Sequence, residues 1–209
     1  MTPPLAERSS AREMQLYCIF FLSGFAALFY QLIWQRALFT LYGTSAESVT
    51  VVVTVFMLGL GLGSLAGGAL SRSPRVSPTL AFALAELLIG ACGLASLPVF
   101  RWVASLTPAA AGMEVGLPAF ALLLLPTLCM GATLPLLSSF AIARSGSVGR
   151  SLGMLYFVNT LGSAAACAAA ALAAFGALGQ GGALQLAATV NFAAAAWVLA
   201  AFRGRGASA

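Results

Sequence analysis

The sequence predicts an all-helical integral membrane protein with six transmembrane helices. Of its 209 residues, 61% are hydrophobic and only 7% are charged. The mean hydropathy is +0.99, well above the value that water-soluble domains tolerate. The few charged residues are also spaced so that long uncharged stretches separate them, and a spanning helix needs about 20 apolar residues to cross about 30 Å of hydrocarbon. Composition and spacing together exclude a soluble globular protein.

The first four helices follow from the distances between charged residues. Uncharged stretches of 22, 24 and 29 residues are enclosed by Glu13 and Arg36, Glu47 and Arg72, and Glu114 and Arg144. A further 25 residues lie between Arg75 and Arg101, interrupted only by Glu86. Each stretch is long enough for one crossing. We therefore expect helices at about 15–35, 46–70, 79–100 and 117–142.

The last uncharged stretch contains two helices. It runs for 52 residues from Arg150 to Arg203, which is too long for one crossing. A cluster of glycines with Gln180 lies near its middle, at Gly176, Gly179 and 181–182, and such a cluster is typical of a turn. We expect helices at about 152–175 and 183–202. Residues 15–202 then form one membrane domain, and 1–14 and 203–209 are polar tails.

The arginines predict the orientation of the helices. Eight of the ten lie in the two tails and in the loops after the second and fourth helices. Only Arg36 and Arg101 lie on the opposite side. Arginine accumulates on the cytoplasmic side of short loops. We expect both termini to be cytoplasmic in a bacterial-type inner membrane, with the segment from Arg101 to Gly116 as the longest external loop.

The residue types that are absent exclude much of enzyme chemistry. The ten basic residues are all Arg, the five acidic residues are all Glu, and the chain has no His, Lys or Asp. It therefore lacks an imidazole base, a Schiff-base lysine and an aspartyl nucleophile. The cysteines lie singly in apolar runs, at Cys18, Cys92, Cys129 and Cys167. We expect no catalytic residue, metal, cofactor or nucleic-acid partner, and a lipid bilayer as the surroundings.

One ionisable residue is expected at membrane depth, where charged groups cost roughly 2.5–3.5 kcal/mol on insertion scales. Glu86 lies about seven residues into the third helix, and Asn159 lies about seven residues into the fifth helix, which enters from the same side. The two side chains are thus expected at similar depth, where they can meet. Two interpretations stay open: a structural hydrogen bond, or a site for a proton or an organic cation.

Other positions on the helices predict packing or have weaker signals. Gly59, Gly63 and Gly67 recur every four residues on the second helix, a pattern that allows close approach of another helix. Gln31 lies near the outer end of the first helix, where an interfacial place would suit it. Asn191 lies near the middle of the sixth helix. We assign the glycines to helix packing.

Five segments resemble the membrane domain of the membrane-fused spermidine synthase-like proteins, whose membrane part is similar to the major facilitator superfamily. They are FLSGFAALFYQLIWQRAL (21–38), FMLGLGLGSLAGGAL (56–70), LAELLIG (84–90), LPTLCMGATLPLL (125–137) and VGRSLGMLYFVNTLGSAAA (148–166). The PTxxMGxTLP and GxLYxxNTxG patterns are the most specific of these. Where the family tends to carry an acid after the tyrosine of the first segment, this chain has Gln31.

The resemblance implies a six-helix half of a facilitator-type fold, built as two inverted three-helix repeats in which Gly24 and Gly131 correspond. It implies a role with polyamines or other amines. We take Glu86, Asn159, Tyr156 and Gln31 as the ligand-binding candidates. The soluble aminopropyltransferase domain of the family has essential aspartates, and a chain without Asp cannot contain it.

Three hypotheses about function follow from these observations. In the first, the chain is a non-catalytic membrane module that handles an amine for a separate aminopropyltransferase-like partner. In the second, it is a half-size transporter that forms a homodimer to complete a central cavity. In the third, it is a structural anchor or assembly subunit without a ligand. Glu86 favours the first two, and the low charge of the helices favours the third.

Overall fold

The computed structural model describes residues 5–42, 45–106 and 113–202, and in these ranges the chain is helical apart from short connections. The elements in chain order are α1 (Leu5–Tyr42), α2 (Ser45–Ser71), α3 (Pro78–Leu106), α4 (Met113–Ser145), α5 (Val148–Ala169), the π-helical turn η1 (Ala170–Ala174) and α6 (Phe175–Phe202). Six of these helices are long and apolar enough to cross a membrane. The described residues thus have the architecture of a multi-pass membrane protein.

The helices extend beyond their predicted ends in several places. Helix α1 begins at Leu5 and not near residue 15, because Ala, Glu and Arg in the intervening segment continue a helix and no Pro or Gly interrupts it. Helix α3 continues to Leu106 and α4 begins at Met113. Most of the predicted loop from Arg101 to Gly116 is therefore helical. The rest of that loop, and the predicted tail at 203–209, lie outside the described residues.

The chain reverses direction between the fifth and sixth membrane spans at a glycine. Gly179 has φ 63° and ψ −175°, a non-helical conformation inside the nominal α6 range. Only glycine adopts such angles without strain, because a Cβ would clash with the backbone. The turn lies inside the predicted glycine cluster. Just before it, the chain widens into η1, an uncommon π-helical turn.

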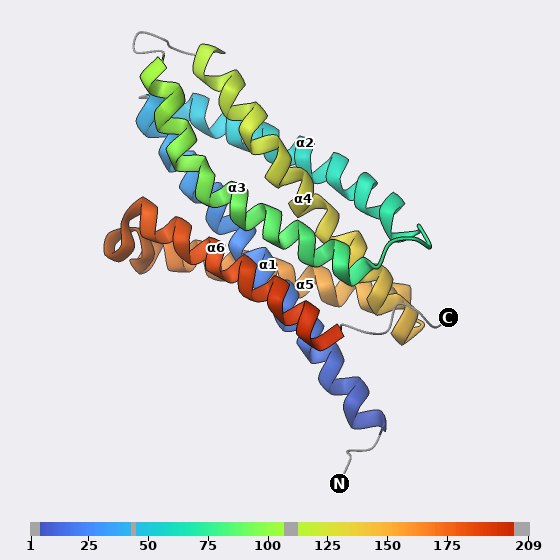
Figure 1. Ribbon diagram of the computed structural model, residues 1–209. Coiled ribbons are helices and arrows are strands. Elements are labelled where there is room, and N and C mark those ends of the chain that lie inside the picture. The colour runs from blue at the N-terminus through green and yellow to red at the C-terminus, as the bar shows by residue number, and fades with distance from the viewer. Residues whose placement is uncertain (1–4, 43–44, 107–112, 203–209) are drawn as a thin grey trace.

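Each helix packs against particular neighbours in the bundle (Figure 1). Helix α2 lies against α4, α1 lies against α5 and α6, and α3 contacts both α4 and α6. The glycine stripe of α2 faces α4 at close range. A methyl group at Gly59, Gly63 or Gly67 would come within 3.0 Å of atoms of Thr127, Leu128 or Ala132. The absence of side chains at these three positions lets the two backbones approach.

Aromatic side chains fix α1 at the centre of the helix bundle. Tyr30 and Trp34 are both fully buried and stack with ring centroids 5.1 Å apart. The indole nitrogen of Trp34 donates a hydrogen bond to the Ser96 hydroxyl of α3 at 2.8 Å. A buried indole N–H requires such a partner. This contact fixes the position of α1 along α3.

Candidate functional site

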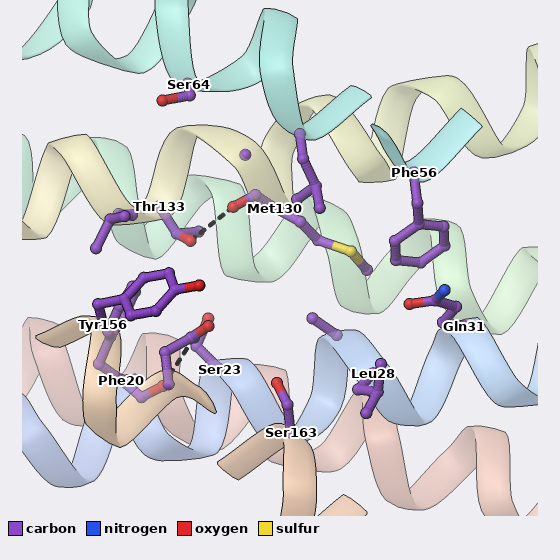
Figure 2. Close-up of a pocket in the computed structure, with 15 residues that line it drawn as sticks. Phe20, Ser23, Leu28, Gln31, Phe56, Ser64, Met130, Thr133, Tyr156 and Ser163 are labelled. Carbon is purple, nitrogen blue, oxygen red and sulfur yellow. Dashed lines mark hydrogen bonds between the residues drawn. The ribbon is translucent and has the colours of Figure 1, made fainter. Parts of the chain in front are cut away.

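A cavity of about 330 Å³ lies between α1, α2, α4 and α5. Figure 2 shows its side chains, with α2 and α4 on one side and α1 and α5 on the other. Apolar groups and neutral polar groups both line it. The polar ones are Ser23 and Gln31 of α1, Ser64 of α2, Thr133 of α4, and Tyr156, Asn159 and Ser163 of α5. The size is at the lower end of the range for small-molecule sites.

Helical spacing brings the polar groups of α5 to one face. Tyr156, Asn159 and Ser163 are three and four residues apart, so they lie one above another along the helix. The Asn159 amide donates to the Phe20 carbonyl at 3.3 Å, and the Ser163 hydroxyl donates to the Gly24 carbonyl at 3.1 Å. These bonds hold the polar face of α5 against α1. The Tyr156 hydroxyl points toward the middle of the cavity (Figure 2).

Gly24 makes this close approach possible. A Cβ at this position would clash with the backbone carbonyl oxygen of Asn159, which cannot rotate away as a side chain can. Gly162 of α5 meets α1 in the same way, since its Cβ would lie 3.0 Å from the carbonyl carbon of Phe21. The two glycines together set the distance between α1 and α5, and hence one width of the cavity.

Glu86 is fully buried and does not line the cavity. Its carboxyl group accepts two hydrogen bonds, one from the Ser23 hydroxyl at 2.5 Å and one from the Asn191 amide at 2.5 Å. Ser23 lines the cavity. The carboxyl group is therefore separated from the cavity by a single hydroxyl group.

The expected contact between Glu86 and Asn159 is not formed. The two residues were expected at similar depth, where they can meet, but depth fixes neither the rotation of a helix about its axis nor the identity of its neighbours. Helix α3, which carries Glu86, packs against α6. The amide partner of Glu86 is therefore Asn191, whose signal in the sequence was weaker, and Asn159 bonds to α1 instead.

Two buried polar atoms in the described part of the chain have no hydrogen-bond partner. They are the Tyr30 hydroxyl and the Asn191 side-chain carbonyl oxygen. A buried polar group without a partner costs about 1–3 kcal/mol. The two atoms lie at different places: Asn191 bonds to Glu86, whereas Tyr30 lies two turns beyond Ser23 on α1 and its ring lies against Gly93 of α3.

Three of the four residues proposed from the sequence lie in one place. Gln31, Tyr156 and Asn159 line the cavity, and Glu86 is hydrogen-bonded to a fourth lining residue, Ser23. Sequence reasoning missed Ser23 and Ser163. Ser163 could have been found, because it lies one helical turn after Asn159 on the same face.

The cavity lining consists mainly of neutral side chains. The residues of the described chain that line the cavity include hydroxyl, amide, aromatic and aliphatic side chains and no ionisable acid or base other than the phenol of Tyr156. Among the described residues no group of three His, Cys, Asp or Glu side chains is placed to hold a metal ion. The arrangement can accept and donate hydrogen bonds and offer aromatic faces to a ligand.

Comparisons with known proteins give no match: no family model, no curated protein and no solved structure matches the chain.

Proposed function

We propose that the chain is a non-catalytic membrane module that holds an amine, such as a polyamine, in the cavity between α1, α2, α4 and α5. The resemblance to the membrane part of spermidine synthase-like proteins suggests the class of ligand. The observation that carries the proposal is the convergence of the candidate residues: Gln31, Tyr156 and Asn159 line one cavity, and Glu86 contacts it through Ser23.

The chemistry of the lining supports an amine. The Ser23 hydroxyl uses its proton for Glu86, so its oxygen lone pairs remain available to accept from an ammonium N–H. Donation to a carboxyl group also polarises the hydroxyl and strengthens it as an acceptor. Gln31 and Asn159 supply further carbonyl oxygens, and the ring of Tyr156 can attract a cation through its π face.

Ligand-induced thermal stabilisation tests this proposal. Detergent-solubilised protein is melted with and without putrescine or spermidine, for the parent and for Gln31→Leu. A ligand at a hundred times its Kd stabilises a protein by about 2.7 kcal/mol. The parent should show the shift and Gln31→Leu should lose most of it. Gln185→Leu is the matched control, since Gln185 is exposed on α6 away from the cavity.

Two results would count against an amine site. If neither amine shifts the melting temperature of the parent, the result would favour the hypothesis of a structural anchor without a ligand. Equal losses for Gln31→Leu and Gln185→Leu would show that the amine acts elsewhere on the protein.

Pairs of contacts support our further proposal that the fold is an inverted repeat of α1–α3 and α4–α6. Gly24 of α1 meets Asn159 of α5, and Gly131 of α4 meets Leu60 of α2. The relation recurs three residues earlier on α1 and α4 and three residues later on α5 and α2. There Gly162 of α5 meets Phe21, and Gly63 of α2 meets Leu128. A shift of 107 positions relates both residues of α1 to those of α4, and a shift of 99 relates both residues of α2 to those of α5.

The third pair of helices fits the same relation. A shift of 105 positions relates Glu86 of α3 to Asn191 of α6, and these two side chains contact each other. Equivalent residues touch each other when they lie on a two-fold axis. Because α1 and α4 cross the membrane in opposite directions, the axis proposed here lies in the membrane plane, as in transporters with inverted repeats.

One observation favours a half-size transporter as a second candidate function. Helices α2 and α5 both line the cavity, yet they are the least buried of the six spans. Only 28% of the most apolar stretch of α2 and 22% of that of α5 are buried. In a bilayer, the polar groups of the cavity between such exposed helices must be shielded from lipid by another protein surface. A second copy of the chain would supply it. Chemical cross-linking in the membrane tests this, and a purely monomeric protein would remove the candidate.

We also propose that both termini face the cytoplasm of a bacterial-type inner membrane, which the arginine distribution supports. A separate aminopropyltransferase-like partner would then meet the module on that side and exchange the amine with it.

A further inference from the structure

A second cavity, of about 580 Å³, lies near the outer end of α1, beside η1 and the start of α6. It shares no residue with the amine cavity. Its walls are mostly apolar and include Leu32, Ala171, Leu172 and Phe175. Leu172 is 84% exposed, so this wall continues into the surface that faces the bilayer. The cavity is therefore accessible from the lipid.

Arg36 is the only charged side chain among the described residues that line this cavity. Its guanidinium carbon lies 5.1 Å from the centroid of the Phe175 ring. Such a contact holds the planar group over the ring face and leaves its N–H edge free to bind an anion. A cationic group in an apolar cavity favours a ligand that has an anionic end and an apolar end.

The depth of Arg36 fits the headgroup region of a bilayer. The bond between Trp34 and Ser96 aligns α1 with α3. Arg36 is two residues beyond Trp34, and Trp102 is six residues beyond Ser96 in the same direction. Arg36 thus lies about 6 Å deeper than Trp102 at 1.5 Å per residue. Trp102 is exposed, as expected of an interfacial tryptophan, and an arginine at the depth of Arg36 can extend to lipid phosphates.

The π-helical turn η1 lies at this second cavity. Ala170 and Ala171 of η1 form part of the cavity wall. Short π-helical segments inside longer helices are uncommon and are frequent at functional sites.

We propose that this cavity binds an anionic phospholipid, with the phosphate on Arg36 and the first part of an acyl chain along Leu32 and Leu172. The guanidinium group makes paired N–H···O bonds to phosphate oxygens. A free phosphate ion offers the same oxygens without the chain, and the experiment separates the two sources.

The test titrates phosphatidylglycerol into detergent-solubilised protein and measures the melting temperature. The parent should gain a saturable shift that phosphatidylcholine and inorganic phosphate do not produce. Arg36→Gln should raise the half-saturating lipid concentration about fivefold, which corresponds to the ~1 kcal/mol of one basic residue near anionic lipid. Arg101→Gln is the matched control, because Arg101 is exposed at the same end of the bundle and does not line the cavity.

A second pair of variants tests the cavity itself without changing a charge. Ala171→Trp fills the space beside Arg36 and should abolish the lipid-dependent shift. Ala168→Trp adds the same bulk at an exposed position of α5 outside the cavity and should retain it. An unchanged shift in Arg36→Gln or in Ala171→Trp would overturn the proposal. An equal shift with phosphatidylcholine, or with inorganic phosphate, would overturn it as well.

Discussion

A single methyl group added to α2 should destabilise the protein at one glycine and not at its neighbour. In Gly63→Ala, the new Cβ would lie 2.8 Å from the Leu128 carbonyl carbon and 3.0 Å from its Cα. Ordinary van der Waals contact begins near 3.4 Å, so α2 and α4 must separate by roughly half an ångström or more. The obstacle is backbone, which cannot rotate away as a side chain can. Overpacking of this kind costs about 1–3 kcal/mol.

Gly61→Ala is the matched control, because a Cβ at Gly61 meets nothing within 4 Å. It changes the same residue type on the same helix and leaves the contact with α4 intact. Reversible unfolding in mixed micelles, with helical content as the signal, gives the free energy of unfolding of both variants. We expect a loss for Gly63→Ala alone. If both variants match the parent, the face of α2 with Gly63 does not pack against α4 and the helix arrangement is wrong.

Three further predictions test other parts of the structure. Glu86→Leu should lower the free energy of unfolding by about 1–3 kcal/mol, because it removes the acceptor of two buried hydrogen bonds. Glu86→Gln should have a smaller effect, because the amide keeps the size of the side chain and one acceptor. Chemical unfolding of both variants checks this, and equal effects would refute it. Trp34→Phe should cost about 0.5–1.5 kcal/mol for the lost bond to Ser96, and the same variant in a Ser96→Ala background should lose less. A reporter active only in the cytoplasm should be active when fused at Ala209 and silent when inserted near Gly112; the reverse pattern would overturn the orientation.

The number of helices and their order could be predicted from sequence, because the length of each uncharged stretch fixes how many times it can cross a bilayer. The turn at Gly179 was predicted for a similar reason, since a stretch of 52 uncharged residues must reverse once and the glycines lie at its middle. The ends of the helices were not predicted well. Nothing in the segment after Leu5 stops a helix, and hydropathy does not measure where a helix ends outside the membrane.

The candidate site could be predicted only in part. Spacing along α5 places Asn159 and Tyr156 on one face, but it does not say which helix that face meets. Gln31 was expected near the interface, and it lines the cavity because α1 extends well beyond the predicted span. The partner of Glu86 depends on the contact between α3 and α6, two helices far apart in the chain. Helix neighbours of this kind depend on packing of the whole bundle, which hydropathy does not encode.

Direct binding of a labelled amine tests the central claim, that the cavity between α1, α2, α4 and α5 holds an amine. Purified protein is immobilised and titrated with radiolabelled putrescine. We predict saturable binding that spermidine displaces, and about three- to tenfold weaker binding for Tyr156→Phe, the ratio for loss of one hydrogen bond. Tyr17→Phe, a change of the same kind outside the cavity, should bind as the parent does. Absence of saturable binding by the parent, or equal binding by both variants, would contradict the account.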